Sequence, residues 1–199
     1  MIKWIFFDLG STLLDETSRA QEVVEATAAR LHVSPELFEA MLEGAARRHP
    51  YVLRKELLGG VTWAPWPKRL DPLYPGVPEL LQKLRERCRL GVIANHGTGI
   101  LAQMNLAPYF DVAAVSQELG VSKPDPRIFQ LALERAGCMP EEALMVGDRL
   151  DNDVAPAKRL GMKTLWIRQG WGGKAVPASE EMQPDMTIDT LEELLPCID

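Results

Sequence analysis

The 199-residue sequence lacks the features that mark several broad classes of protein. It has no block of basic residues, and its 28 acidic residues outnumber its 22 basic ones, which makes nucleic acid and anionic membrane surfaces poor partners. No apolar stretch approaches the ~20 residues that a membrane-spanning helix needs. Internal repeats and low-complexity segments are also missing. We therefore expect a globular protein that binds neither nucleic acid nor a membrane.

Cysteine is scarce as well. Cys88, Cys138 and Cys197 are odd in number, scattered, and without the spacing of metal ligands. We interpret them as free thiols in a reducing compartment, which points to the cytoplasm. The apolar run from Ile2 to Phe7 is too short for a secretory signal, and it ends in Asp8 rather than in small cleavable residues. The sequence indicates no oligomeric state.

What the sequence does contain is a regular alternation of apolar strands and amphipathic helices from about residue 76 onward. Asp125 followed by Pro126 predicts a capped helix start, Gly137 predicts the end of that helix, and Thr190 with Glu193 predicts a capping box. This alternation predicts an α/β fold, a Rossmann-like parallel sheet flanked by helices. The expected strands are 2–7, 90–94, 112–115, 143–146 and 163–168, and the expected helices are 78–87, 99–106, 126–136 and 154–160.

Residues 15–72 break this rhythm because they contain no convincing strand. They predict two amphipathic helices and then a stretch rich in proline and tryptophan that includes Trp63 and Trp66. We predict an α/β core domain formed by residues 1–14 and 73–199, with a small helical cap formed by residues 15–72 above the end of the first strand. We expect the two tryptophans to pack within this cap or at its hinge, in preference to stacking on the substrate.

Carboxylates follow two of the apolar runs. Asp8 closes the first run, and Asp148 opens an acidic cluster after the run that ends at Val146. Ligands of open parallel sheets bind just outside the carboxyl ends of the strands, so we expect both carboxylates in one site. Carboxylates that converge in this way either hold a divalent cation or repel one another strongly.

On these residues the chain resembles the haloacid dehalogenase (HAD) superfamily of phosphatases and related hydrolases. The segment from Phe6 to Leu13 is similar to its first motif, usually Asp-x-Asp-x-Thr/Val, and the segment from Val92 to Gly97 falls where the second belongs. Lys123-Pro124 matches the third motif, and Gly147-Asp148 with Asp153 matches the fourth. The four motifs occur in order over nearly the whole chain. Residues 15–72 are similar to a short version of the family's C1 cap.

The resemblance implies a phosphatase that acts on a small phosphorylated substrate with Mg²⁺ as cofactor. Asp8 would attack phosphorus and form an aspartyl phosphate, and Lys123 would restrain the nucleophile and the phosphoryl charge. The residues implied in holding Mg²⁺ are Asp8, the Gly10 carbonyl, Asp148 and Asp153. The residues implied in phosphate binding are Thr12, Asn95, His96 and Lys123. Phosphoryl transfer needs mainly in-line positioning and neutralisation of the equatorial oxygens, which a hard cation and a lysine provide.

Two positions depart from the family pattern. Gly10 replaces the second aspartate of the first motif, the usual general acid/base, and Ala94 replaces the hydroxyl of the second motif. Losing positioned acid–base assistance forfeits roughly 10² to 10⁴ in rate, so we expect slow turnover and a preference for good leaving groups. His96 is either a substitute proton donor in the pocket or an ordinary loop histidine.

Two alternative functions stay open from the sequence. The first is a weakened or non-enzymatic member that binds phosphate or a protein partner, because Gly10 and Ala94 both replace usual catalytic residues. The second is a dehalogenase that uses Asp8 on carbon without a metal. It is less favoured, because Asp148 and Asp153 would then lack a cation and no tyrosine occupies position 10.

Overall fold

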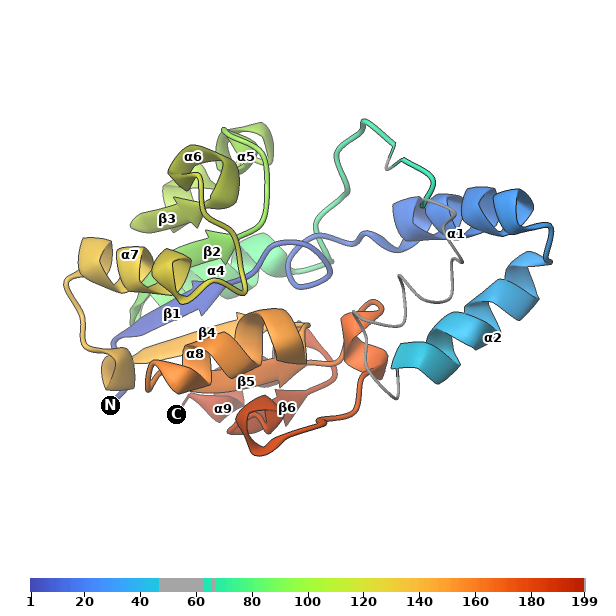
Figure 1. Ribbon diagram of the computed structural model, residues 1–199. Helices are drawn as coiled ribbons and strands as arrows, with labels where there is room; N and C mark the ends of the chain where they lie inside the picture. Colours follow the sequence, from blue (N-terminus) through green and yellow to red (C-terminus); the bar gives the residue numbers. More distant parts are fainter. Residues whose placement is uncertain (47–62, 66, 199) are drawn as a thin grey trace.

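The computed structural model describes residues 1–46, 63–65 and 67–198. Its centre is a six-stranded parallel sheet with the order β3-β2-β1-β4-β5-β6 (Figure 1). The strands are β1 (Trp4–Phe7), β2 (Arg89–Ala94), β3 (Val112–Val115), β4 (Ala143–Gly147), β5 (Lys163–Ile167) and β6 (Met186–Ile188). This confirms the predicted fold class. The short edge strand β6 was not among the predicted strands.

Helices connect and flank the strands. They are α1 (Thr17–Leu31), α2 (Pro35–Ala46), α4 (Val77–Arg85), α5 (Ile100–Gln103), α6 (Ser116–Leu119), α7 (Pro126–Ala136), α8 (Ala155–Arg159) and α9 (Leu194–Cys197). A π-helical turn (Leu150–Val154) precedes α8. Short 3₁₀ turns occur at Ala107–Tyr109, Pro140–Glu142, Gly172–Lys174, Glu180–Met182 and Leu191–Glu193. None of the helices in the described ranges is long and apolar enough to cross a membrane.

The predicted helix signals operate as expected in α7. The Asp125 carboxylate accepts a hydrogen bond from the Arg127 N–H, Pro126 occupies the first turn, and Gly137 ends the helix with a φ of 60°. The capping box of Thr190 and Glu193 also forms. These local signals depend on backbone groups a few residues away, which is why the sequence predicts them well.

The apolar run of β1 is buried on both faces of the sheet. Ile5 and Phe7 belong to one hydrophobic cluster, which α4 and the C-terminal Leu191 and Leu194 complete. Trp4 and Phe6 belong to the other cluster, which includes buried residues of α7 and α8. Continuous burial of this kind is typical of a central parallel strand covered on both sides, and it explains why the run shows no polar alternation.

The helix pair α1 and α2 lies beyond the end of the sheet opposite to the two chain termini (Figure 1). It has its own cluster of buried apolar side chains, and Trp63 packs against Phe38 with ring centroids 5.5 Å apart. This agrees with the predicted packing role of Trp63. Trp66 lies outside the described residues. Trp171, from the loop after β5, also packs against the cluster and links the helix pair to the sheet.

Candidate active site

The order in which the chain adds strands to the sheet reverses between β1 and β4. It passes from β1 to β2 and β3 on one side, and β4 then returns to the other side of β1. Asp8 directly follows β1, and its N–H donates to the Val146 carbonyl oxygen of β4 at 2.9 Å. Asp148 directly follows β4. The two aspartates therefore flank a topological switch point, where open α/β sheets bind ligands.

Lys123 links the first and the fourth predicted motifs at the centre of this site. Its Nζ donates to Asp8 Oδ1 and to Asp153 Oδ1, both at 2.6 Å. The Lys123 and Asp153 side chains are 1% and 0% exposed, while Asp8 keeps 13% of its side chain open to the cavity. Burial lowers the pKa of Lys123, but Asp153 and Asp8 outweigh this effect and hold it above its usual value. The lysine is therefore a fixed positive charge beside Asp8.

Asn95 holds the backbone of Lys123 in place. The Lys123 N–H donates to Asn95 Oδ1 at 2.7 Å, and Asn95 Nδ2 donates to the Lys123 carbonyl oxygen at 2.9 Å. Since Asn95 follows β2, this amide pair ties the ends of two distant segments together. Asn95 lines the cavity, and its hydrogen bonds support the backbone of Lys123. Its contact with phosphate stays a prediction.

The carboxylates Asp8, Asp148 and Asp153 offer oxygens that all lie within 4.8 Å of one another. Burial raises the pKa of Asp148, and repulsion from Asp153 and Asp8 raises it further. Burial also raises the pKa of Asp153, to about 6, although Lys123 opposes the shift. Three carboxylates thus share this space with the Lys123 ammonium, while Arg149, which opposes the shift of Asp148, is itself paired with Asp151. A bound cation would relieve the remaining imbalance.

This donor set fits Mg²⁺, which prefers carboxylate and carbonyl oxygens. Asp8 and Asp148 supply carboxylates next to the cavity, and Gly10 lines the same cavity. Asp153 has a supporting geometry, because its Oδ1 accepts from Lys123 and its Oδ2 accepts from the Arg149 N–H at 3.0 Å. Asp153 is therefore suited to orient its neighbours.

The other two predicted phosphate ligands differ in their placement. His96 is half-buried and lines the cavity, and its Nδ1 accepts a hydrogen bond from the Gly97 N–H at 2.8 Å. Burial and Arg19 lower the pKa of His96, which favours a neutral ring with the proton on Nε2. Thr12 is fully buried and is not among the residues that line the cavity, so its phosphate contact stays a prediction.

The cavity above Asp8 has a volume of about 310 Å³. Its lining includes residues that the sequence analysis did not single out for the site: Leu9, Glu16, Ala20, Arg149, Asn152, Trp171 and Gly172; Ser11, which it assigned to ordering the turn, also lines it. Gly172 lies against Asp148, because a Cβ at this position would come within 2.4 Å of Asp148 Oδ2. No sequence signal distinguishes most of these residues, since they come from loops whose paths depend on tertiary packing.

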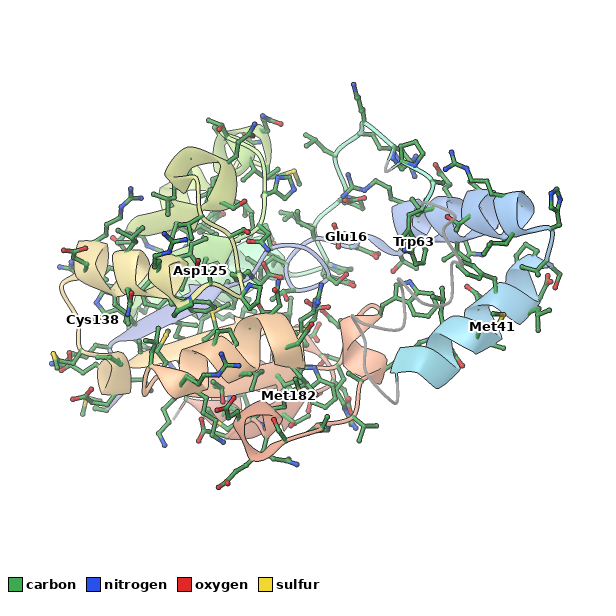
Figure 2. The ribbon with its side chains drawn as sticks, viewed as in Figure 1. Glu16, Met41, Trp63, Asp125, Cys138 and Met182 are labelled. Carbon is green, nitrogen blue, oxygen red and sulfur yellow. The ribbon has the colours of Figure 1, made fainter. Side chains whose placement is uncertain are left out.

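Glu16 is the most informative of these additions. It immediately precedes α1 and lies where the helix pair meets the sheet (Figure 2). Its carboxylate accepts hydrogen bonds from Ser11 Oγ at 3.1 Å and from Arg19 at 3.0 Å. Burial raises the pKa of Glu16, with a contribution from Asp8, against the opposing effects of Ser11 and Arg19. A largely buried carboxyl group thus stands beside the predicted nucleophile.

The comparisons with known proteins agree with this geometry. The family model described as haloacid dehalogenase-like hydrolase matches residues 2–161. Because the match covers most of the chain, including all four motif segments, this protein belongs to that family of hydrolases.

Among curated relatives, a glyceraldehyde 3-phosphate phosphatase from Methanocaldococcus jannaschii is 31% identical over 98% of this chain and 96% of its own length. Another protein of that name, from Methanopyrus kandleri, is 40% identical over 61% of this chain. That match spans 54% of the relative, about half of its length.

Solved structures of two kinds resemble this one. A HAD phosphatase from Thermococcus onnurineus is 27% identical, with a TM-score of 0.63 and coverage of 100% of this chain and 98% of the other. A 2-haloacid dehalogenase from Pseudomonas syringae is 26% identical, with a TM-score of 0.66 and the same coverage. The fold alone therefore does not separate the two chemistries.

Proposed function

We propose that this protein is a Mg²⁺-dependent phosphatase that hydrolyses a small phosphorylated metabolite through an aspartyl phosphate on Asp8. The observation that carries the proposal is the Lys123 ammonium, 2.6 Å from both Asp8 and Asp153, beside the carboxylate of Asp148. A carboxylate nucleophile surrounded by acidic groups needs positive charge nearby to approach an anionic phosphate ester. Family membership supports the same reading.

In this mechanism one oxygen of the Asp8 carboxylate, which lines the cavity, attacks phosphorus while Lys123 donates a hydrogen bond to Oδ1. Lys123 also offsets charge on the phosphoryl oxygens, and Asn95 keeps the lysine in position. When bound, Mg²⁺ supplies charge neutralisation and orients the phosphoryl group. Asp8, Asp148 and the Gly10 carbonyl are its proposed ligands, with Asp153 in support. His96 and Thr12 stay candidate phosphate ligands.

The substrate proposal rests on the relatives and on the size of the cavity. Proteins named glyceraldehyde 3-phosphate phosphatase recur among the relatives, and one named phosphoserine phosphatase from Thermus thermophilus is 34% identical over 64% of this chain. A cavity of about 310 Å³ suits a metabolite of a few carbon atoms. Glyceraldehyde 3-phosphate and phosphoserine are the first two substrates to test.

Residues 15–72 form the cap in this proposal, and residues 1–14 and 73–199 form the core. The separate apolar cluster of α1 and α2 supports this division. The ion pair of Lys174 with Glu43 and the packing of Trp171 against the cluster supply the contacts between the two parts. Closure of such a cap excludes water from the reacting phosphate.

The test is hydrolysis of para-nitrophenyl phosphate with Mg²⁺ and with EDTA, for the native protein and for Asp8→Asn. We expect turnover that requires Mg²⁺ and that Asp8→Asn abolishes. Asp189→Asn is the matched control, because Asp189 is an exposed aspartate paired with Arg168 and is not among the residues that line the cavity. Trapped phosphate on native protein, absent from Asp8→Asn, identifies the aspartyl phosphate.

The dehalogenase alternative has a specific basis in the similar structure from Pseudomonas syringae. It predicts halide release from a 2-haloacid without any metal. Metal-independent halide release with no phosphate release would overturn the phosphatase proposal. Binding of phosphate without turnover of any phosphate ester would instead support the non-enzymatic alternative.

A further inference from the structure

Departure of an alcohol from a phosphate ester is slow unless a nearby group donates a proton to the leaving oxygen. Among the carboxylates of the site, Asp8 is the proposed nucleophile, and Asp153 is fully buried, does not line the cavity and accepts hydrogen bonds at both oxygens. Asp148 is a proposed metal ligand. Gly10 has no side chain to contribute. The remaining carboxyl group that lines the cavity within the described residues is that of Glu16.

The Glu16 carboxyl group fills the space in front of Gly10. A Cβ built on Gly10 would lie 2.7 Å from Glu16 Oε2 and 3.0 Å from its Oε1 and Cδ. These separations are below van der Waals contact, so any side chain at position 10 would compete with this carboxyl group for the same volume. Gly10 and Glu16 are therefore sterically matched: the absence of a side chain at Gly10 leaves the volume that the Glu16 carboxyl group occupies.

The ordinary role for an acidic residue at this position is excluded by its contacts. Glu16 is the N-cap residue of α1, but its side chain makes no capping hydrogen bond. It points instead to Ser11 and Arg19. Arg19 also pairs with the buried Asp71 at 2.5 Å, so it fixes the Glu16 side chain while sharing its charge with a second carboxylate.

Glu16 also stands between two cavities. The cavity over Asp8 and an adjoining cavity of about 180 Å³ share Ser11, Glu16, Ala20 and Trp171 in their linings. The adjoining cavity extends toward Gln21, Glu39 and Lys174, on the helix pair and the loop after β5. A substrate with its phosphate over Asp8 and its organic part in the adjoining cavity would pass its bridging oxygen close to Glu16.

We propose that Glu16 is the general acid and base of this hydrolase, a role that rests on the proposed phosphatase function. It acts on the leaving oxygen and then on the attacking water from the space in front of Gly10. With this group in place, the reason to expect a restriction to good leaving groups disappears, and alkyl phosphates become suitable substrates.

Glu16 gives up one proton and regains one proton in each turnover. In the first step an Asp8 oxygen bonds to phosphorus, and the bond from phosphorus to the leaving oxygen breaks with its electron pair on that oxygen. The Glu16 carboxyl proton moves to this oxygen and completes the alcohol. In the second step the Glu16 carboxylate takes a proton from water as the water oxygen bonds to phosphorus. The bond between phosphorus and Asp8 then breaks with its electron pair on the Asp8 oxygen, which releases phosphate and restores the Asp8 carboxylate and the protonated Glu16 carboxyl group.

The experiment compares Glu16→Gln with native protein on para-nitrophenyl phosphate and phenyl phosphate, two esters of similar shape. Nitrophenolate leaves readily without a proton, whereas phenolate does not. The kcat/KM value reports only the steps up to this departure. We expect Glu16→Gln to lower kcat/KM by about 10² to 10⁴ for phenyl phosphate and far less for para-nitrophenyl phosphate. Glu22→Gln, an exposed residue on the same helix, is the matched control.

A second variant tests the steric match and guards against a folding defect in the first. Gly10→Asp in the native background should give no gain, because its side chain competes with Glu16. Gly10→Asp combined with Glu16→Ala should recover most of the kcat/KM for phenyl phosphate that Glu16→Ala loses, because an aspartate then fills the vacated space. This non-additive rescue is not expected if Glu16 only braces the loop.

Three outcomes would overturn the role. An equal loss on both esters, with no rescue by Gly10→Asp, would make Glu16 a structural residue. Unchanged kcat/KM values in Glu16→Gln would remove it from the reaction while leaving the phosphatase function intact. A native protein that hydrolyses neither ester with Mg²⁺ would overturn the proposed function, and the role of Glu16 with it.

Discussion

At the residue scale, the main feature of the site is that the buried carboxylates outnumber the cationic side chains beside them. Lys123 is fully buried with two carboxylates at 2.6 Å, and Asp148 is buried nearby. Removing a charged group from water costs several kcal/mol unless a partner of opposite charge compensates. Three aspartates held together beside Lys123 therefore form a site whose charge balance a bound cation would complete.

This imbalance predicts a pH dependence in metal-free protein. The pKa of Asp153 is 3.8 when unperturbed and about 6 in the folded state. Because the folded value is the higher one, protonation favours the folded state, and this stabilisation is present below about pH 4 and is lost as pH rises through about 6. Relative to Asp153→Asn, native protein in EDTA should lose about 1–3 kcal/mol of unfolding free energy between about pH 4 and pH 7.

Urea unfolding of both proteins at several pH values measures this difference. Subtracting the unfolding free energy of Asp153→Asn from that of native protein removes the titration of all other groups. The change of this difference with pH therefore reports on Asp153. A difference that stays constant across this range would mean that Lys123 fully compensates Asp153 without a metal.

At the scale of elements, the helix pair is important because α1 begins next to the loop that follows β1, which carries Gly10 and Ser11. The chain leaves β1, passes Gly10 and Ser11, and brings Glu16 back over them just before α1. Phe38 of α2 is fully buried in the cluster that holds the two helices together. The orientation of α1, and through it the position of Glu16, therefore depends on packing that is separate from the core of the sheet.

Truncation of Phe38 tests this separation. Phe38→Ala removes a fully buried ring, a change that costs about 3–5 kcal/mol where the whole unit must stay packed. We expect faster amide hydrogen exchange in residues 17–46, with exchange in β1 and β4 unchanged. Leu37→Ala is the control, because Leu37 is 53% exposed and should leave exchange as it is. Faster exchange throughout the sheet would instead make the cap and the core one cooperative unit.

At the scale of the whole molecule, the site is assembled from segments far apart in the chain. Asp8, Lys123 and Asp153 are separated by 115 and 30 residues, yet they form one hydrogen-bonded chain. Since only the folded state brings them together, a cation that binds them stabilises the fold as a whole.

Mg²⁺ should therefore raise the unfolding free energy of the native protein. At a concentration 100 times its Kd, the gain is about 2.7 kcal/mol. Asp148→Asn, which removes one proposed ligand, should lose this gain while it folds normally in EDTA. Thermal unfolding with Mg²⁺ and with EDTA gives both quantities. An equal gain in Asp148→Asn would place the cation elsewhere.

The fold class, the cap of α7 and the candidate motif residues of the site could all be predicted from the sequence. These depend on patterns within a few residues: apolar runs, capping residues, and carboxylates at strand ends. The sequence also identified Gly10 as a departure. What it could not supply was the group that stands in front of Gly10, because no local pattern distinguishes Glu16 from the other acidic residues of its segment.

The position of Glu16 in front of Gly10 follows from the tertiary structure. The loop after β1 folds back so that the Glu16 carboxyl group, six residues later, comes to lie against Gly10, held by Ser11 and Arg19. The edge strand β6 and the approach of Gly172 to Asp148 are further examples. Each depends on packing between segments distant in sequence, whereas a sequence pattern records only what a residue's near neighbours require.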